Sequence, residues 1–490
     1  MRTVLVLLDS MNRHFLSTYG NDWVQTPNID RLAEDSVVFD NHWLGSAPCM
    51  PARRDIFTGR LNFLDRNWGG IEPYDITLPQ KLREKEIYTH ITTDHTHYVE
   101  TGGENYLQQF NTWEIIRGQE FDAWASRVNP PELPDEYYGK AGAQYELNRS
   151  QFKEEKDFPT PKTMASACEW VDNNKGADDF FLMVEGFDPH EPFDTPEEYL
   201  ELYEDDYEGP RYEWSGYEQV EEDSDATQHL RKKYAATLTM ADYWLGKFMD
   251  TLQQNDMWED TLFILTTDHG HLLGEHGWTG KNRMHVYNEL AHLPLIISQP
   301  GNKRAGDRVE ALTQNIDLMP TILEYYDIEI PESVKGKSLK GVLEGKIKEE
   351  NHRDTALYGW HGKTVNITDG KYTYFRAPAR EDNYPCYIYG AIPTSLWRFL
   401  GKGREDQIEM GRFLSYTDYP VYKIPVSAKG IESETIKHVK NTLLFDIEKD
   451  YQQKNPINDE EIEKEMIEKL KKSMKEADAP EEQFDRLGLS

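Results

Sequence analysis

LFILTTDHGH, residues 262–271, joins a short apolar run to a group of polar side chains. Apolar residues followed by Thr266-Thr267-Asp268-His269 are typical of a buried parallel strand that ends at a functional edge of a sheet. Similar short apolar runs occur at four other places in the chain. They are Val4–Leu8 before Asp9, Ile87–Ile91 before Thr92-Thr93-Asp94-His95, Phe180–Val184 before Glu185, and Leu295–Ile297.

Amphipathic stretches lie between these runs. They include Ile29–Glu34, Leu78–Glu84 and Tyr234–Leu252. Strands that alternate with helices predict a doubly wound α/β sheet, and ligands of such sheets bind beyond the carboxyl ends of the strands. The polar residues that follow the runs are therefore expected to share one edge of the sheet: Asp9, His95, His190 and Asp268-His269.

The chain carries a strong excess of negative charge. Its 490 residues include 54 Lys and Arg against 88 Asp and Glu, which gives a formal net charge of −34. Such a charge repels nucleic acids and anionic membranes, and no stretch approaches the ~20 apolar residues of a membrane span. We therefore expect no nucleic-acid partner and no membrane insertion. An anionic substrate would need a local cationic pocket.

The cysteines and the N-terminus bear on the cellular compartment. Cys49, Cys168 and Cys386 form neither a disulfide framework nor a zinc pattern. The N-terminal apolar run is too short for a signal peptide, and no small-residue cleavage site follows it. A cytoplasmic location is expected, or a periplasmic one if a signal was removed.

The sequence pattern changes after about Asn351. Residues 364–377, TVNITDGKYTYFRA, alternate around an Asp-Gly turn and predict a β-hairpin. An apolar TLLFDI segment and a helix over 460–476 follow. We expect a catalytic α/β domain over residues 1–360. A C-terminal subdomain with a small antiparallel sheet and a terminal helix is expected over 361–490.

Some segments have two interpretations. Residues 132–157 and 197–225 are acidic and weakly periodic, and we expect surface insertions that could also shape a substrate cleft. Trp113, Arg117 and Glu120 could line a pocket. Ordinary packing or surface roles explain these three residues equally well.

APCMPARRDIFTGR, residues 47–60, concentrates positive charge in this acidic chain. Ala52–Thr58 has helical spacing, and Pro51 suits the first turn of a helix. Cys49 is therefore expected at a helix N-terminus, where free backbone N–H groups favour an anion, and Arg53 can reach the same place. These features predict a lowered pKa for the Cys49 thiol. A capped helix with an incidental cysteine has the same local pattern.

This stretch resembles the sulfatase signature, in which Cys or Ser is followed by x-Pro-x-Arg and later by Thr-Gly-Arg. The matching residues are Cys49, Pro51, Arg53, Thr58, Gly59 and Arg60. In that family a maturation enzyme oxidises the cysteine to formylglycine (3-oxoalanine), an aldehyde that is hydrated to a geminal diol. The resemblance implies a formylglycine nucleophile at residue 49 and a formylglycine-generating enzyme as a partner.

Other segments resemble the family in the same order along the chain. In LLDSMNRHF the first Asp, here Asp9, corresponds to a residue that binds a divalent cation. TTDHGHLLGEHGWTGK resembles the second metal segment, with Asp268 and His269 as ligands and Lys281 as the sulfate-contacting lysine. FDPHEPF matches a segment whose His, here His190, contacts the leaving oxygen.

THITTDHTHY resembles a segment that reads Lys-x-His in many members, which places His95 and His97 in those roles. The chain departs from the family at two positions. Ser10 stands where many members have a second carboxylate or amide, so its hydroxyl or the Asn12 side chain would complete the metal shell. His95 stands in the lysine position, which would make the local positive charge depend on pH.

The resemblance implies a fold and an activity. The fold is alkaline phosphatase-like: a large mixed, mostly parallel sheet between helices, with a smaller antiparallel subdomain. The activity is hydrolysis of a sulfate monoester on a carbohydrate or a small aryl alcohol. Ca²⁺ is the expected cation, with Mg²⁺ or Mn²⁺ as alternatives. Its implied ligands are Asp9, Ser10, Cys49, Asp268 and His269.

The remaining implied roles concern charge and protons. Arg53, Lys281 and His95 would hold the sulfate charge. His190 or Lys281 would protonate the leaving alcohol, and His97 would take the proton whose loss expels sulfate and restores the aldehyde.

Two other functions compete with this one. Phosphonate monoester and phosphodiester hydrolases of the same superfamily share the nucleophile, metal and lysine. A protein that binds sulfated glycans without ever acquiring formylglycine belongs to a different class. The intact Cys-x-Pro-x-Arg core favours an enzyme.

Overall fold

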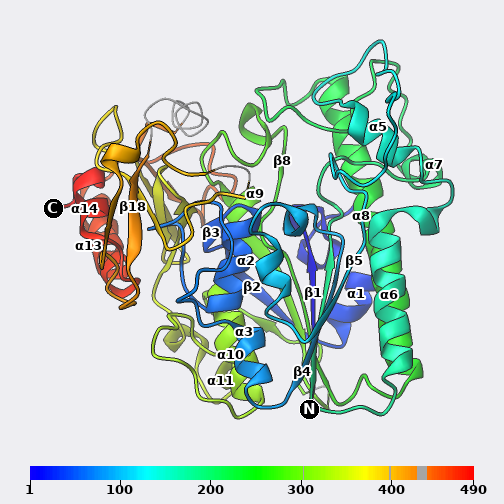
Figure 1. Ribbon diagram of the computed structural model, residues 1–490, viewed down its shortest axis with the longest axis horizontal. Coiled ribbons are helices and arrows are strands. Elements are labelled where there is room, and N and C mark those ends of the chain that lie inside the picture. The colour runs from blue at the N-terminus through cyan, green and yellow to red at the C-terminus, as the bar shows by residue number, and fades with distance from the viewer. Residues whose placement is uncertain (302, 397–398, 427–438) are drawn as a thin grey trace.

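The computed structural model describes residues 1–301, 303–396, 399–426 and 439–490, and its largest element is a nine-stranded sheet. The strands are β1 (Arg2–Leu8), β2 (Val37–Trp43), β4 (Tyr88–Thr93), β5 (Thr112–Ile115), β6 (Phe180–Gly186), β7 (Thr261–Thr266), β10 (His292–Ser298), β11 (Arg308–Val309) and β12 (Thr313–Gln314). Their order is β11-β2-β10-β7-β1-β6-β4-β5, and β12 pairs with β2. Figure 1 labels β1, β2, β4 and β5 of this sheet. Each of the five predicted apolar runs forms one of these strands.

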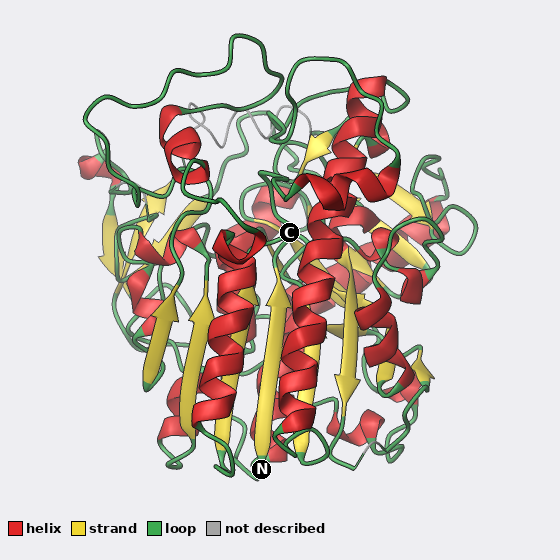
Figure 2. Ribbon diagram, turned by 90° about the vertical axis from the view of Figure 1, so that its right-hand side faces the viewer, coloured by secondary structure: helices red, strands yellow, loops and turns green. Residues whose placement is uncertain are grey.

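Helices cover both faces of the sheet, as Figure 2 shows for one face. Along the central strand β1, Val4, Val6 and Leu8 point to one face and Leu5 and Leu7 to the other, each set within its own buried cluster. The first cluster includes α1 (Pro27–Glu34), α6 (Pro159–Asn173) and α8 (Asp225–Gln254). The second includes α2 (Cys49–Thr58), α3 (Leu78–Arg83), α10 (Leu318–Tyr325) and α11 (Lys340–Leu343). The predicted α/β sandwich is confirmed.

One strand was assigned the wrong direction. The run Leu295–Ile297 was expected to be parallel, but β10 is antiparallel to both β7 and β2. A parallel pairing needs a crossover, usually a helix, that returns the chain to the opposite edge of the sheet. Between β7 and β10 the chain forms only short elements: β8 (Leu272–Leu273), β9 (Thr279–Gly280) and α9 (Asn288–Ala291). The next strand therefore runs back from the edge where β7 ends.

A second, mostly antiparallel sheet lies beside the first. It contains β3 (Ser46–Ala47), β13 (Ala356–Trp360), β14 (Val365–Thr368), β15 (Tyr372–Arg376) and β19 (Leu443–Asp446). The order is β19-β15-β14-β13-β3, and β14 and β15 form the predicted hairpin. The expected division of the chain at residue 360 stays a prediction.

Two helices and a third sheet complete the C-terminal part. The terminal helices are α13 (Glu460–Glu476) and α14 (Glu481–Leu487). Met466, Leu470 and Met474 of α13 are buried against the second sheet, so this side of the helix is a packing face. The third sheet contains β16 (Tyr387–Gly390), β17 (Glu409–Gly411) and β18 (Val421–Pro425). Among the described residues, no helix is long and apolar enough to cross a membrane.

The two acidic insertions are more ordered than expected. The first holds α5 (Ala143–Arg149), the second holds α7 (Glu197–Leu200), and both project at one end of the molecule (Figure 1). A β-bridge joins Tyr137 to Arg211, and Trp214 is buried. The insertions therefore form one structured layer beyond the sheet.

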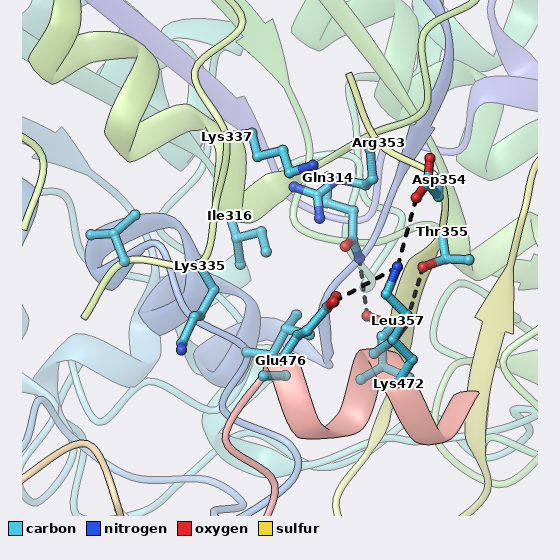
Figure 3. A pocket seen from close by; sticks show the side chains of 14 residues that line it. Gln314, Ile316, Lys335, Lys337, Arg353, Asp354, Thr355, Leu357, Lys472 and Glu476 are labelled. Atoms are coloured by element: carbon cyan, nitrogen blue, oxygen red, sulfur yellow. Dashed lines mark hydrogen bonds and ion pairs between the residues drawn. The ribbon is translucent and has the colours of Figure 1, made fainter. Parts of the chain in front are cut away.

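A cavity of about 290 Å³ lies where α13 approaches β13. Figure 3 shows Lys472 between Asp354 and Glu476, at 3.9 and 3.8 Å from their carboxylates. Arg353 reaches the buried Asp317 carboxylate, which also accepts the backbone N–H of Lys337 at 2.7 Å. Lys472 and Arg353 are thus each paired with carboxylates.

Asp317 gives a test of this junction. Although burial opposes its charge, Arg353 and His352 lower the pKa of Asp317 to about 2. The folded-state pKa of Asp317 lies below the ordinary value of 3.8. The charged carboxylate therefore stabilises the fold at pH values above 3.8, and this stabilisation is lost as the pH falls toward about 2. An Asp317→Asn variant is expected to lose about 2 kcal/mol of unfolding free energy near neutral pH.

The difference between this variant and the wild type should shrink as the pH falls through the native pKa. Urea unfolding at neutral and acidic pH measures it. Asp354→Asn, at a side chain that is 83% exposed, is the matched control and should change little. An equal loss at both pH values would show that the charge of Asp317 is not what stabilises the junction.

Candidate active site

The carboxyl ends of four neighbouring strands, β7, β1, β6 and β4, form the floor of the site. Asp268-His269, Asp9, His190 and His95 follow these strands in that order, and the structure brings them to one edge of the sheet. This is the placement expected for a doubly wound sheet.

Arg53 lies at the centre of a buried charge cluster. The helix α2 begins at Cys49, and Arg53 one turn later donates to three carboxylates. Its Nε lies 2.6 Å from Glu185, Nη1 2.6 Å from Asp268, and Nη2 2.8 Å from Asp9. All four side chains are fully buried, and the carboxylates raise the pKa of Arg53 although burial opposes its charge.

Glu185 was not assigned a role from the sequence. It lies near the end of β6 and also accepts a hydrogen bond from Thr93 Oγ1 at 2.8 Å. The sequence signal for a role of Glu185 was its position directly after the buried apolar run Phe180–Val184.

Ser10 and Asn12 differ in what their side chains do. Ser10 adopts a left-handed backbone with φ of +61° and donates from Oγ to Asp9 at 2.8 Å and from its backbone N–H to Asp268 at 3.1 Å. Asn12 accepts the backbone N–H of His14 and donates to the carbonyl of His271, both at 2.8 Å. The Ser10 hydroxyl thus faces the carboxylates, whereas the Asn12 side chain bonds to backbone groups.

Four residues could hold a metal ion. Asp9, Cys49, Asp268 and His269 each offer a ligand atom, and these atoms lie within 4.8 Å of one another. His269 Nδ1 donates to the Gly270 carbonyl at 2.8 Å, which leaves the Nε2 lone pair directed toward Cys49 Sγ at 3.2 Å. An imidazole oriented by a carbonyl is a common metal ligand.

The charges of the cluster also suit a cation. Asp9, Glu185 and Asp268 bring three buried carboxylates, and Arg53 and Lys281 supply two positive charges. Carboxylate and hydroxyl oxygens are the ligands that hard divalent cations prefer. The residues present therefore fit a divalent ion.

The expected lowering of the Cys49 pKa is wrong. Burial raises the pKa of the thiol well above its usual range, and Asp9 and Asp268 add to this effect. Lys281 and Arg53 act in the opposite direction but do not outweigh it. Cys49 is indeed the first residue of α2, but desolvation exceeds the favourable effect of the helix N-terminus.

Lys281 and His190 form a buried hydrogen-bonded pair. Lys281 Nζ contacts His190 Nε2, and it lies 3.3 Å from Ser10 Oγ and 3.7 Å from Glu191. Burial opposes the charge of Lys281, but Cys49, Glu191 and Asp9 raise its pKa. Burial lowers the pKa of His190 well below its usual range.

These contacts indicate which of Lys281 and His190 carries the proton that lies between them. His190 Nδ1 donates to the Glu191 carbonyl at 2.5 Å, so its Nε2 accepts from the charged Lys281. The fully buried Glu191 carboxylate lies 3.4 Å from His190 Nδ1 and 3.5 Å from His271 Nδ1. Glu191 and His271 are thus parts of the site to which the sequence reading gave no role.

His95 and His97 lie together on the β4 side of the site. Their ring centroids are 5.1 Å apart, and His95 Nδ1 lies 3.7 Å from Asp9. His97 Nδ1 lies 3.0 Å from the Glu100 carboxylate. Burial and Arg53 lower the pKa of His95 well below its usual range, so His95 is neutral at pH 7. The expected pH-dependent charge at this position is not found.

The structure distinguishes the three residues that could line a pocket: Trp113, Arg117 and Glu120. Trp113 is 46% exposed on β5, away from the site. Arg117 pairs with Asp122 in its own loop, with Nε 2.7 Å from the carboxylate. Glu120 faces the site, and its Oε1 lies 3.8 Å from His190 Nδ1.

The site lies at a parallel-sheet edge and combines a buried cysteine at a helix N-terminus, two buried cations and a metal-ligand cluster. This combination is typical of a hydrolase of anionic esters. The chain belongs to the sulfatase family, because the Sulfatase family model matches residues 2–328. The expected family is thus confirmed, and membership supports a sulfuric ester hydrolase.

Known proteins resemble the chain in sequence and in structure. The arylsulfatase of Clostridium perfringens is 25% identical over 380 residues, which cover 70% of this chain and 78% of that protein. A solved structure in complex with its substrate D-glucosamine-2-N,6-O-disulfate has a TM-score of 0.68 at 19% identity, and covers 98% of each chain.

The phosphonate monoester hydrolase of Agrobacterium radiobacter has a TM-score of 0.66 at 18% identity, and the match covers 97% of this chain and 95% of that chain. These likenesses show the fold of the alkaline phosphatase superfamily, so the expected fold class is confirmed.

Proposed function

We propose that the chain hydrolyses a sulfate monoester on a carbohydrate or a small aryl alcohol, with a nucleophile derived from Cys49. The observation that carries this proposal is the convergence of Cys49, at the start of α2, with Asp9, Asp268 and His269 in one buried cluster. The Cys-x-Pro-x-Arg core around Cys49 supports its conversion to formylglycine by a maturation enzyme.

The cofactors of the reaction would lie in this cluster. Asp9, Asp268, His269 and the Ser10 hydroxyl, with residue 49, would hold Ca²⁺, or Mg²⁺ or Mn²⁺ in its place. When bound, such an ion polarises a sulfate oxygen, and formylglycine supplies a hydroxyl nucleophile.

The chain's own residues perform the remaining work. Arg53 holds the three carboxylates in position, and Arg53 and Lys281 give the edge the positive charge that a sulfate needs. Lys281 carries a proton at Nζ beside His190 Nε2, and it would donate this proton to the leaving alcohol oxygen. His97, held by Glu100, would accept a proton from residue 49 in the second step.

Lys281→Met tests the acid role. The variant is expected to lose about 10²–10⁴-fold in kcat/KM on alkyl sulfates, because their alkoxide leaves poorly without a proton. The loss on 4-nitrophenyl sulfate should be much smaller, since nitrophenolate needs little protonation. Steady-state kinetics measure the loss of kcat/KM on each of the two esters. Equal losses on the two would assign Lys281 to binding alone.

Hydrolysis of phosphonate monoesters is the second candidate. The structural likeness to a phosphonate monoester hydrolase favours it. Phenyl sulfate and phenyl methylphosphonate, assayed on protein coexpressed with the maturation enzyme, separate the two functions. We expect kcat/KM to be higher on the sulfate, and a preference for the phosphonate would overturn the proposal.

Mass spectrometry of residue 49 accompanies this assay. An aldehyde at residue 49 is the expected result in the native host. An unmodified cysteine there would favour a sulfated-glycan-binding protein instead.

A further inference from the structure

Glu120 places a carboxylate at the site that no step of the proposed reaction uses. Its Oε1 lies 3.8 Å from Nδ1 of His190, the residue whose Nε2 contacts Lys281, and 15% of its side chain is exposed. Across the described part of the chain, no group donates a hydrogen bond to this carboxylate. Burial raises the pKa of Glu120 to about 7. A ligand ammonium that donates to this carboxylate would favour its charged form and gain strongly from it.

The loop is built to hold Glu120 in this place. Glu120 has a φ of +46° and Gly118 one of +123°, so two residues of the loop adopt left-handed backbone. Asp122 accepts the Gly118 N–H at 2.9 Å, and Gln119 Nε2 donates to Asp94 at 2.9 Å. Left-handed backbone at a residue other than glycine costs free energy, and such residues are frequent at functional sites.

Tyr217 closes the same side of the site. It comes from the second acidic insertion, has a φ of +56°, and its hydroxyl donates to Glu191. Its ring packs against Gly280, where a Cβ would lie 2.3 Å from the ring and clash. Lys140 Nζ lies over the same ring at 4.0 Å from the centroid. The nearby lysine is thus held by an aromatic ring.

We propose that Glu120 selects the alcohol half of the substrate, and that this alcohol carries an ammonium group close to the ester. An amino sugar or amino alcohol with a free amine has this chemistry. The ammonium would donate a charge-assisted hydrogen bond to Glu120, a neutral hydroxyl would gain less, and a carboxylate would be repelled by Glu120 and Glu191. This inference rests on the proposed hydrolase function and adds the substrate class.

Substituted phenyl esters test the inference. We would measure kcat/KM for phenyl sulfates that carry a meta aminomethyl, hydroxymethyl or carboxylate group. The wild type is expected to prefer the aminomethyl ester to the carboxylate ester by at least about tenfold. Glu120→Gln should reduce this ratio several-fold, and Glu120→Lys should invert it. Because the ratio is taken within each variant, a general loss of activity cancels.

Glu114→Gln is the matched control. Glu114 lies on the preceding strand β5, is exposed and bonds to Ser166, so its variant removes one negative charge without touching the site. It should leave the ratio unchanged. A wild type that does not prefer the amine, or a Glu120→Gln ratio equal to that of the wild type, would overturn the inference.

The same substituents on phenyl methylphosphonates keep the two proposals apart. The substituent ratio is read on whichever ester the wild type cleaves. Unsubstituted phenyl sulfate tests the transferred group alone. If the wild type does not cleave it, the result counts against the sulfatase proposal and not against the role of Glu120.

Discussion

Replacement of Cys49 by alanine is expected to lower kcat/KM for sulfate esters by at least about 10⁴-fold. Cys49 lies 3.2 Å from His269 Nε2 inside the metal-ligand cluster. Under the proposed function it is the residue that the maturation enzyme would convert to an aldehyde. Alanine cannot be converted and offers no atom to attack sulfur. Sulfate release from 4-nitrophenyl sulfate, with the maturation enzyme coexpressed, measures the effect.

Cys168→Ala is the control for this experiment. Cys168 lies on α6 and packs against the cluster on one face of the sheet, whereas α2 and its Cys49 cover the other face. The control variant should retain wild-type turnover. Substantial turnover by Cys49→Ala would place the nucleophile on another residue.

Replacement of Arg53 by methionine is expected to cost about 3–5 kcal/mol of unfolding free energy without divalent cations. The variant leaves Asp9, Glu185 and Asp268 buried without the guanidinium that now bonds all three. Added Ca²⁺ should recover part of this loss, because a cation that binds only the folded state stabilises it by mass action. Turnover should also fall, by about 10²–10³-fold.

Arg54→Met separates this effect from the cost of losing any buried arginine. Arg54 is the next residue of α2 and pairs with the buried Asp75, with Nε 2.7 Å from the carboxylate, away from the site. The metal-ligand cluster is intact in Arg54→Met, so Ca²⁺ should stabilise this variant as much as the wild type and leave the stability difference between the two unchanged. Its turnover should stay within about tenfold of wild type. Urea unfolding with and without Ca²⁺ measures both variants. A stability difference between Arg53→Met and the wild type that Ca²⁺ leaves unchanged would mean that the cation does not replace the charge of Arg53.

Local patterns determined the architecture of this protein. The apolar runs at Val4–Leu8 and Leu262–Leu265 each form a buried strand, and the helix at 460–476 has the predicted bounds. The shared edge for Asp9 and Asp268 also followed, because parallel strands joined by crossovers end on one side of a sheet. The start of a helix at Cys49 could be predicted because Pro51 and the spacing after it act within a few residues.

Other features depend on the tertiary structure. Burial reversed the predicted shift of the Cys49 pKa, and the absence of a crossover made β10 antiparallel. The sequence left Trp113, Arg117 and Glu120 equivalent, and only the folded loop turned Glu120 toward His190.

The physical reason lies in how far apart the partners are along the chain. Arg53 meets Glu185 across 132 residues and Asp268 across 215 residues. Local propensity and periodicity describe neighbours in sequence, so they predict strands, helix starts and the edge where strands end. Desolvation and charge pairing depend on every group that the fold brings close, so the protonation and partners of the site residues were decided by the tertiary structure alone.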